Sequence, residues 1–203
     1  MAEVRIERIT LDDVPRVVTA HIDAFPGFFL TTLGPGFLRA FYRAFTDEPT
    51  AISLKASSPE HPLLGFVVGT VEPDGFFKRL LKRRWWEFGT HAAMASLKNP
   101  AYTSRLLRAV AYRGGPDRPE GFALLSSIAV LPAAQGKGVG KALVSEWKRL
   151  AVENGSPGYY LTTDAVGNDP VNHFYQSLGL KLTSSYTTKE GRVMNLYSQK
   201  LSQ

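Results

Sequence analysis

A glycine-rich segment between an apolar strand and an amphipathic helix constrains the fold of this chain more than any other feature. The strand is predicted at 122–130, and the helix carries apolar residues at helical spacing as far as Ala151. Between them, the sequence from Gln135 to Lys141 has a glycine at every second position. Alternate glycines let a backbone come close to a ligand, and the first amides of a helix favour an anion. This order predicts a site for a ligand that carries a pyrophosphate.

Spacing excludes two other phosphate-binding loops. The P-loop requires a glycine, four residues and then Gly-Lys-Ser/Thr, and this pattern is absent. The dinucleotide pattern Gly-x-Gly-x-x-Gly fails because its last glycine would fall on Lys141 or on Leu143. The sequence therefore does not predict a nicotinamide-dependent enzyme.

The rest of the chain alternates strand and helix patterns, which predicts an α/β fold. Further strands are predicted at 4–9, 51–54, 63–71, 159–163, 180–188 and 192–199, and helices at 10–21, from 35 onward, and at 171–178. The segment 75–113 is helical in pattern with a break at 99–100, so we expect an inserted pair of helices. With 203 residues, 44% of them hydrophobic, the chain can bury one core, and we expect a single domain over 1–203.

Composition excludes several kinds of site. The chain has no cysteine, so it can form no disulfide framework, thiolate metal site or cysteine nucleophile. His61, His91 and His173 lack the spacing of metal ligands, and we predict no metal site. The N-terminus lacks the apolar run of a signal peptide, and no stretch of about 18 apolar residues occurs, so we expect a cytoplasmic protein.

The net charge of +6 is concentrated in the inserted segment. Between Phe76 and Arg113, nine basic residues accompany one acid, Glu87. The sequence 76–86 mixes bulky apolar and cationic residues, as an interfacial amphipathic helix does. One hypothesis is that this segment contacts a membrane surface or an anionic acceptor. The favoured interpretation is an amphipathic lid that packs on the acceptor side of the domain or on a second subunit, and no nucleic acid is expected.

The glycine segment resembles the acetyl-CoA signature of the Gcn5-related N-acetyltransferase (GNAT) family, Gln/Arg-x-x-Gly-x-Gly/Ala. The sequence 135–140 matches it at every defined position and follows Val130-Leu131-Pro132, similar to the family's Val-x-Pro. The sequence 168–180 resembles the second signature, an Asn, then an aromatic-Tyr run closed by Leu-Gly-Phe. It departs at Leu180, where phenylalanine is commoner, and at His173, where a small residue is frequent. The resemblance covers roughly 122–200, and the N-terminal half matches only in its order of elements.

The resemblance implies a fold and a set of ligand contacts. The fold is a mixed, mostly antiparallel sheet with helices on both faces, splayed between the fourth and fifth strands where acetyl-CoA enters. The backbone of 128–130 would pair with the pantetheine arm, and the amides of 136–141 would hold the pyrophosphate with Gln135 beside it. The residues implied to contact acetyl-CoA are Ile128, Ala129, Val130, Gln135, Gly136, Lys137, Gly138, Val139, Gly140, Lys141, Asn168, Asn172 and Tyr175.

The same resemblance implies one catalytic side chain. Tyr175 occupies the family's general-acid position, and a phenol with an ordinary pKa of about 10 can donate a proton to a thiolate. We expect Phe174, its neighbour, to fill the core position instead. A backbone N–H of 128–130 would stabilise the oxyanion.

The general base stays open. The strand before the glycine segment offers only Ser126 and Ser127, so one possibility is a base that acts through water. The others are Asp164, at the end of the fifth strand, and His21 or Asp23, which we expect in the loop between the first two helices.

The sequence therefore predicts an N-acetyltransferase that moves the acetyl group of acetyl-CoA to a primary amine by direct attack. The expected acceptor is a small molecule, either anionic or sugar-linked, and a homodimer is a further expectation. Two alternatives stay open. One is transfer of a larger acyl chain, and the other is a module that binds acyl-CoA, a polyanion or a membrane surface without transferase activity.

Overall fold

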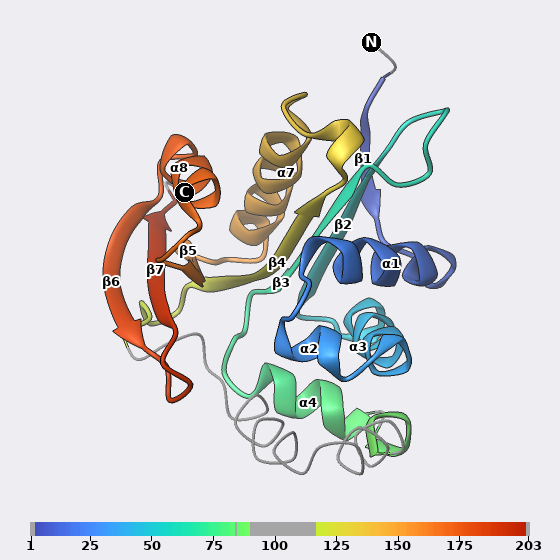
Figure 1. Cartoon of the computed structure of the whole chain (residues 1–203), viewed down its shortest axis with the longest axis horizontal. Coiled ribbons are helices and arrows are strands. Elements are labelled where there is room, and N and C mark those ends of the chain that lie inside the picture. Colours follow the sequence, from blue (N-terminus) through green and yellow to red (C-terminus); the bar gives the residue numbers. More distant parts are fainter. Residues whose placement is uncertain (1–2, 84, 90–116, 202–203) are drawn as a thin grey trace.

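The computed structural model describes residues 3–83, 85–89 and 117–201. Its strands form one seven-stranded sheet in the order β1-β2-β3-β4-β5-β7-β6 (Figure 1). They are β1 (Arg5–Arg8), β2 (Ala51–Ser57), β3 (Gly65–Thr70), β4 (Ala123–Val130), β5 (Gly158–Asp164), β6 (Lys181–Thr187) and β7 (Val193–Lys200). Neighbouring strands are antiparallel except for β4 and β5, which confirms the predicted mixed, mostly antiparallel sheet.

Helices cover both faces of this sheet, as predicted. They are α1 (Val14–Ala24), α2 (Phe29–Thr32), α3 (Pro35–Asp47), α4 (Phe76–Arg83), α7 (Val139–Glu153) and α8 (Asp169–Ser177), with short 3-10 turns at Leu11–Asp13 and Pro132–Ala134. Alternate residues of β3 point to opposite faces, so Phe66 and Val68 pack in one core with α1, α3 and α4. Val67 packs in a second core with α7 and α8. The two cores flank the sheet in Figure 1.

Trp147 anchors α7 on its face of the sheet. Its side chain is fully buried, and its Nε1–H donates a hydrogen bond to the carbonyl oxygen of Ile52 at 3.2 Å. Gly69 of β3 lies directly beneath it, because a Cβ there would be 2.5 Å from Cζ2 of Trp147 and 2.3 Å from the carbonyl oxygen of Leu124. The missing side chain therefore lets α7 lie close to the sheet, which positions the N-terminus of that helix.

A β-bulge interrupts β4 at Ser126. Val68 pairs with Ser127 and Gly69 pairs with Leu125, so Ser126 has no partner residue in β3. An extra residue reverses the alternation of side chains along a strand. Leu125 therefore packs in the core with α7, whereas Ala129, four residues later, packs in the core with α1 and α3.

The parallel pair β4 and β5 is short, and the two strands diverge after it. Only Ala123 with Tyr159 and Leu124 with Tyr160 are paired. Beyond this point β4 continues to pair with β3, and β5 with β7, so the inner edges of 125–130 and 161–164 have no partner among the described strands. The sheet is thus splayed between its fourth and fifth strands, as expected (Figure 1).

Helix α4 and the helical residues 85–89 are parts of the predicted helical insertion that the structure describes. Phe76 and Leu80 are buried in the core, and Arg79 and Arg83 both form ion pairs with the carboxylate of Glu48. The apolar side of this basic helix is therefore packed in the protein core. This packing favours the lid interpretation over insertion of the helix into a membrane surface. The predicted break at 99–100 and the second helix lie outside the described residues.

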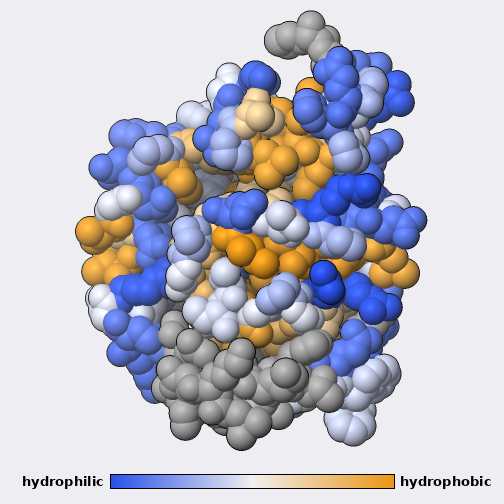
Figure 2. Space-filling view, turned by 45° about the vertical axis from the view of Figure 1, so that its right-hand side comes forward, coloured by the Kyte–Doolittle hydropathy of each residue, from blue (hydrophilic) through white to orange (hydrophobic). Residues whose placement is uncertain are grey.

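Some apolar side chains do reach the surface. Trp85 and Trp86, just after α4, are 69% and 54% exposed. Figure 2 shows an apolar band across the middle of the face that it presents, bordered by polar residues. Within the described ranges, no helix is both long and apolar enough to cross a bilayer.

Candidate functional site

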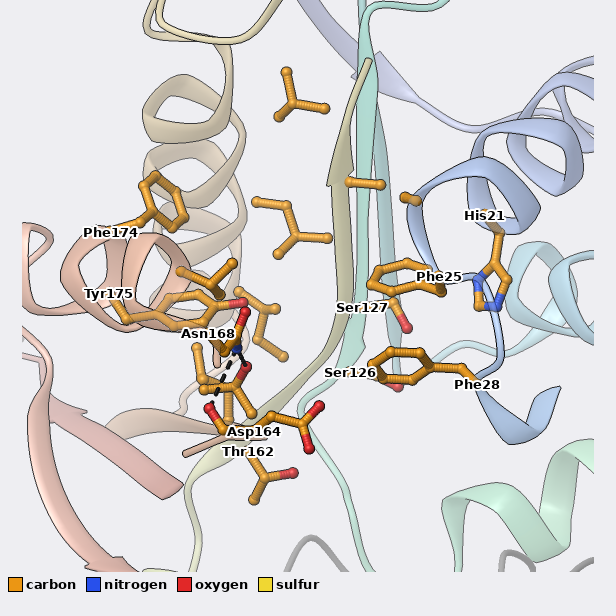
Figure 3. Close-up of a pocket in the computed structure, with 18 of the residues that line it drawn as sticks. His21, Phe25, Phe28, Ser126, Ser127, Thr162, Asp164, Asn168, Phe174 and Tyr175 are labelled. Atoms are coloured by element: carbon orange, nitrogen blue, oxygen red, sulfur yellow. Dashed lines mark hydrogen bonds between the residues drawn. The ribbon is translucent and has the colours of Figure 1, made fainter. Parts of the chain in front are cut away.

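A cleft of about 1700 Å³ lies in the opening between β4 and β5. Its walls come from β4 and β5, from the N-terminal end of α7, from α8, from α1 to α4, and from the segment between β6 and β7. Figure 3 shows the residues of α8 on one side of it and those of α1 on the other, with β4 between them. Because the strand edges here are unpaired, their backbone groups are free to bind an extended ligand as an added strand would.

The glycine segment forms the turn into α7 at one end of this cleft. Gly136 and Gly138 have φ angles of +73° and +80°, in the left-handed region that other residues adopt at a cost. A Cβ at either position would meet nothing within 4 Å, so the backbone here faces open space. Gly138 is the N-cap of α7 and no side chain caps that helix, so its first amides can bind an anion.

Gly140 has a different reason to be glycine. A Cβ at this position would lie 3.2 Å from Cζ of Phe174, so the absent side chain makes room for α8. Val139, Gly140 and Lys141 all line the cleft, whereas Lys137 does not. The side-chain amide of Gln135 lines it too, and donates a hydrogen bond to the carbonyl oxygen of Val130 at 3.1 Å. Gln135 thereby fastens the turn that follows β4.

The two asparagines of α8 have separate environments. Asn168 lines the cleft, and its Nδ2 donates a hydrogen bond to Oγ1 of Thr163 at 2.8 Å. Asn172 does not line the cleft. Its Nδ2 donates to the carbonyl oxygens of Asp164 and Asn168, and its Oδ1 accepts hydrogen bonds from two side chains of β7. Asn172 therefore holds α8 against β5 and β7, and only Asn168 is placed to contact a ligand.

Tyr175 lines the cleft and is 6% exposed. Burial raises the pKa of its phenol above the ordinary value, so the hydroxyl stays protonated. Its hydroxyl has no hydrogen bond to any residue that the structure describes, and Figure 3 shows the ring directed into the cleft. The expectation that Phe174 fills the core instead was wrong. Tyr175 packs beside Tyr197 in the core, and Phe174 is only half-buried.

The candidate bases differ in their surroundings. His21 and Asp23 lie in the last turns of α1 rather than in a loop, because that helix continues to Ala24. Burial lowers the pKa of His21 to about 4, which makes it a weak proton acceptor. Asp164 forms an ion pair with Arg192, 2.7 Å between Oδ2 and Nη2. Asp23 is exposed and has no ion pair with any residue in the described part of the chain.

Ser126 and Ser127 line the cleft where β4 leaves β5. Burial raises the pKa of Tyr42 in α3 and the nearby hydroxyl of Ser127 lowers it, and the Tyr42 hydroxyl is 2.7 Å from Nδ1 of His21. The Nε2 atom of His21 is buried without a partner among the described residues. The structure thus links a residue of the cleft wall to a buried, neutral imidazole.

Tyr42 and Arg192 were not predicted from the sequence as residues of the site. Arg192 binds the carboxylate of Asp164, and its guanidinium carbon lies 4.8 Å from the ring centroid of Phe28. Tyr42 belongs to an aromatic pattern that predicts only the apolar face of a helix, and no local pattern relates Arg192 to partners so far away in the sequence. In the described ranges, no three acidic or histidine side chains are grouped as metal ligands.

The comparisons with known proteins concern the whole fold. The model of the acetyltransferase (GNAT) family matches residues 59–180, which is more than half of the chain. A search of curated proteins found no match. Among solved structures, an acetyltransferase assigned to the GNAT family from Desulfovibrio desulfuricans is 16% identical, with a TM-score of 0.62 over 98% of this chain and 100% of that one.

Two other solved structures carry more specific descriptions. The ribosomal-protein-S18-alanine N-acetyltransferase from Escherichia coli is 16% identical, with a TM-score of 0.57 over 99% of this chain and 96% of that one. A protein from Bacillus anthracis assigned as a streptothricin acetyltransferase, solved in complex with acetyl coenzyme A, is 16% identical, with a TM-score of 0.52 over 79% and 69%. At such identities these likenesses show a shared fold. Together with the family match and the splayed sheet, they show that this chain belongs to the GNAT acetyltransferase family.

Proposed function

We propose that this protein is an N-acetyltransferase that uses acetyl-CoA to acetylate the primary amine of a small molecule. One observation carries the proposal: a glycine turn with left-handed Gly136 and Gly138 leads into an uncapped helix beside an unpaired strand edge. These features open into one cleft large enough for a nucleotide-linked arm and an acceptor. The cytoplasmic location, the homodimer and the membrane contact expected from the sequence stay predictions.

The residues present fit acetyl-CoA, which would supply an activated acetyl thioester. The amides of 136–141 would hold its pyrophosphate, because this part of the backbone faces open space and begins a helix. The unpaired edge of Ile128, Ala129 and Val130 would pair with the amides of its pantetheine arm. Asn168 would contact the same arm from α8, whereas Asn172 would act by positioning α8.

In the proposed reaction, the amine nitrogen forms a bond to the acetyl carbon, and the bond between that carbon and sulfur breaks. Backbone N–H groups on the free edge of β4 would stabilise the negative charge that develops on the carbonyl oxygen. Tyr175 would donate its phenolic proton to the departing sulfur and recover a proton from water. An acceptor that arrives as an ammonium ion first gives one proton to water, and the attacking nitrogen then gives up a second, so that the products are an amide and a thiol.

We propose that water accepts the proton of the amine. His21 is buried with a lowered pKa, and Asp164 is held by Arg192, so neither is well suited as a base. Ser126 and Ser127 lie at the cleft wall and could hold such a water by hydrogen bonds. Asp23, the last candidate for the base, is exposed and has no ion pair with a described residue, so it can attract an ammonium group.

The first test is isothermal titration of the protein with acetyl-CoA and with CoA, using the variant Gly138→Glu. We expect saturable binding by the wild type and a loss of about 100-fold or more in the variant, because a carboxylate would occupy the anion site. The matched control is Gly155→Glu at the other end of α7. That glycine also has a positive φ, +81°, and open space around it. The control should bind like the wild type.

The outcomes separate the possibilities. Failure of the wild type to bind either ligand would refute the proposed function. Binding followed by release of free thiol with a primary amine supports transfer. Binding without turnover of any amine would favour the non-catalytic module, and a preference for longer acyl-CoA would favour transfer of a larger acyl group.

A further inference from the structure

One side of the cleft is lined almost entirely by large apolar side chains from α1 to α4 and the segments that join them. We call this surface the aromatic wall, and its members are Phe25, Phe28, Phe29, Leu30, Phe37, Phe41, Phe77, Leu80 and Leu81. Phe37, Phe41 and Leu80 are buried, so the wall extends into the core, whereas Phe28 is 39% exposed at its outer end. Figure 3 shows Phe25 and Phe28 on the opposite side of the cleft from Tyr175.

The aromatic wall is continuous with the place where transfer would occur. Ser126 and Ser127 of β4 line the same cleft as Phe25 and Phe28. On the proposed function, the acetyl group would lie at this part of β4. An acceptor whose amine faces β4 would therefore have its body against the aromatic wall.

A carboxylate without an ion pair to any described residue lies beside the wall. Asp23, in the last turn of α1 between His21 and Phe25, lines the cleft, is exposed and has no ion pair with any described residue. Asp164 and Arg192 form an ion pair and neutralise each other. The guanidinium of Arg192 also lies over the ring of Phe28. An unpaired carboxylate beside aromatic rings attracts an ammonium ion and repels an anion.

We infer that the acceptor is a primary amine carried on an aromatic or branched aliphatic body without negative charge. Asp23 receives its ammonium group at the entrance, and the aromatic wall encloses its body. This inference rests on the proposed function and replaces the anionic or sugar-linked acceptor that the basic segment suggested. A long acyl chain could also pack against the aromatic wall, but it carries no positive charge that the carboxylate of Asp23 would attract.

The test measures binding of four amines to the protein by titration without acetyl-CoA, and then kcat/KM with it. The amines are 2-phenylethylamine, 3-methylbutylamine, ethanolamine and glucosamine 6-phosphate. We expect the first two to bind and to react more than about tenfold better than the last two, because burial of a phenyl or branched alkyl group favours them. Preference for glucosamine 6-phosphate or for ethanolamine would overturn the inference.

Two variants test the part played by Asp23. Asp23→Asn should weaken binding of 2-phenylethylamine about fivefold and leave the affinity for acetyl-CoA unchanged, since an exposed ion pair contributes little more. The matched control Asp12→Asn, which removes an exposed carboxylate that does not line the cleft, should change neither.

The two proposals can fail separately. Binding of acetyl-CoA without binding of either apolar amine would overturn the acceptor class alone. If the wild type does not bind acetyl-CoA, the proposed function is overturned. The amine titration would still test whether the aromatic wall binds apolar amines. Equal amine affinities of the Asp23→Asn variant and the wild type would exclude Asp23 from the site.

Discussion

At the scale of a single residue, burial makes the Tyr175 side chain suited to donating a proton. Its phenol lies in a cleft wall, its pKa is raised by burial, and none of the described residues accepts its proton. A phenol that stays neutral and unpaired can donate to a group that arrives in the cleft. The same features make it unsuited to act as a base at ordinary pH.

The variant Tyr175→Phe removes only this hydroxyl. We expect kcat to fall about 100-fold while the affinity for acetyl-CoA changes little, because the ring still packs beside Tyr197. Steady-state kinetics and titration measure the two quantities. An unchanged kcat would show that water alone protonates the departing sulfur.

His21 makes the stability of the fold depend on pH. Burial lowers its pKa to about 4, whereas the unfolded chain has the ordinary value of about 6.5. Between these values the unfolded chain binds a proton that the folded chain does not. The contribution of His21 to the free energy of unfolding is therefore complete above about pH 6.5. It is lost as the pH falls towards 4, by up to about 3 kcal/mol.

Denaturant unfolding of the wild type and of His21→Gln between pH 4 and 7 tests this dependence. Glutamine can still form a hydrogen bond with Tyr42 but does not titrate, so the variant should lose less stability on acidification. Carboxylates contribute equally to both proteins and cancel in the comparison. Parallel pH profiles would show that His21 is hydrated in the folded state.

At the scale of elements, the position of α7 depends on its close contact with β3. Gly69→Ala should lower the free energy of unfolding by about 2–4 kcal/mol. The new Cβ would be 2.3 Å from the Leu124 carbonyl oxygen and 2.5 Å from Trp147, and both are fixed by the core. It should also weaken CoA binding, because the proposed anion site lies at the N-terminus of α7.

The control for this prediction is Gly140→Ala in α7 itself. There the new Cβ would be 3.2 Å from the ring of half-buried Phe174, which can move, so we expect a change of less than about 1 kcal/mol. Denaturant unfolding measures both variants. Similar stabilities for the two would mean that the sheet and α7 separate easily, contrary to the packing described above.

At the scale of the whole molecule, the protein consists of two sheet halves that share only a two-residue parallel ladder. The inner edges beyond this ladder have no partner among the described strands. Arg192, which is held by Asp164, contacts the ring of Phe28 and so connects the C-terminal half to the segment after α1. A ligand that pairs with both inner edges would complete the hydrogen bonding of the sheet.

Hydrogen exchange can measure whether a bound ligand protects the amides of the two open strand edges. Adding CoA should slow the exchange of amides in 124–131 and 158–165, and peptides covering 51–57 of β2 should not change, because both edges of β2 are already paired. Protection that spreads equally over the whole sheet would indicate global stabilisation rather than filling of the split.

The features predicted correctly are those that local sequence determines. The apolar strand, the glycine turn and the amphipathic helix follow from composition and periodicity within about 30 residues, and the structure places Gly136 and Gly138 at the head of α7 as predicted. Asn168 and Tyr175 line the cleft, and their contacts with acetyl-CoA stay predictions. The inward turn of Asn172 could not be predicted, because its partners come from β5 and β7.

By itself, the sequence determined the order of elements, the location of the glycine turn and the family to which the chain is similar, because hydrophobic periodicity and glycine spacing report local backbone conformation. Only the tertiary structure decided which distant residues meet. The bulge at Ser126, the pairing of Asp164 with Arg192, the place of Asp23 at the cleft and the aromatic wall all depend on strand register and helix packing. Those contacts are set by how whole faces fit together, and the residues that supply them have no shared pattern along the chain.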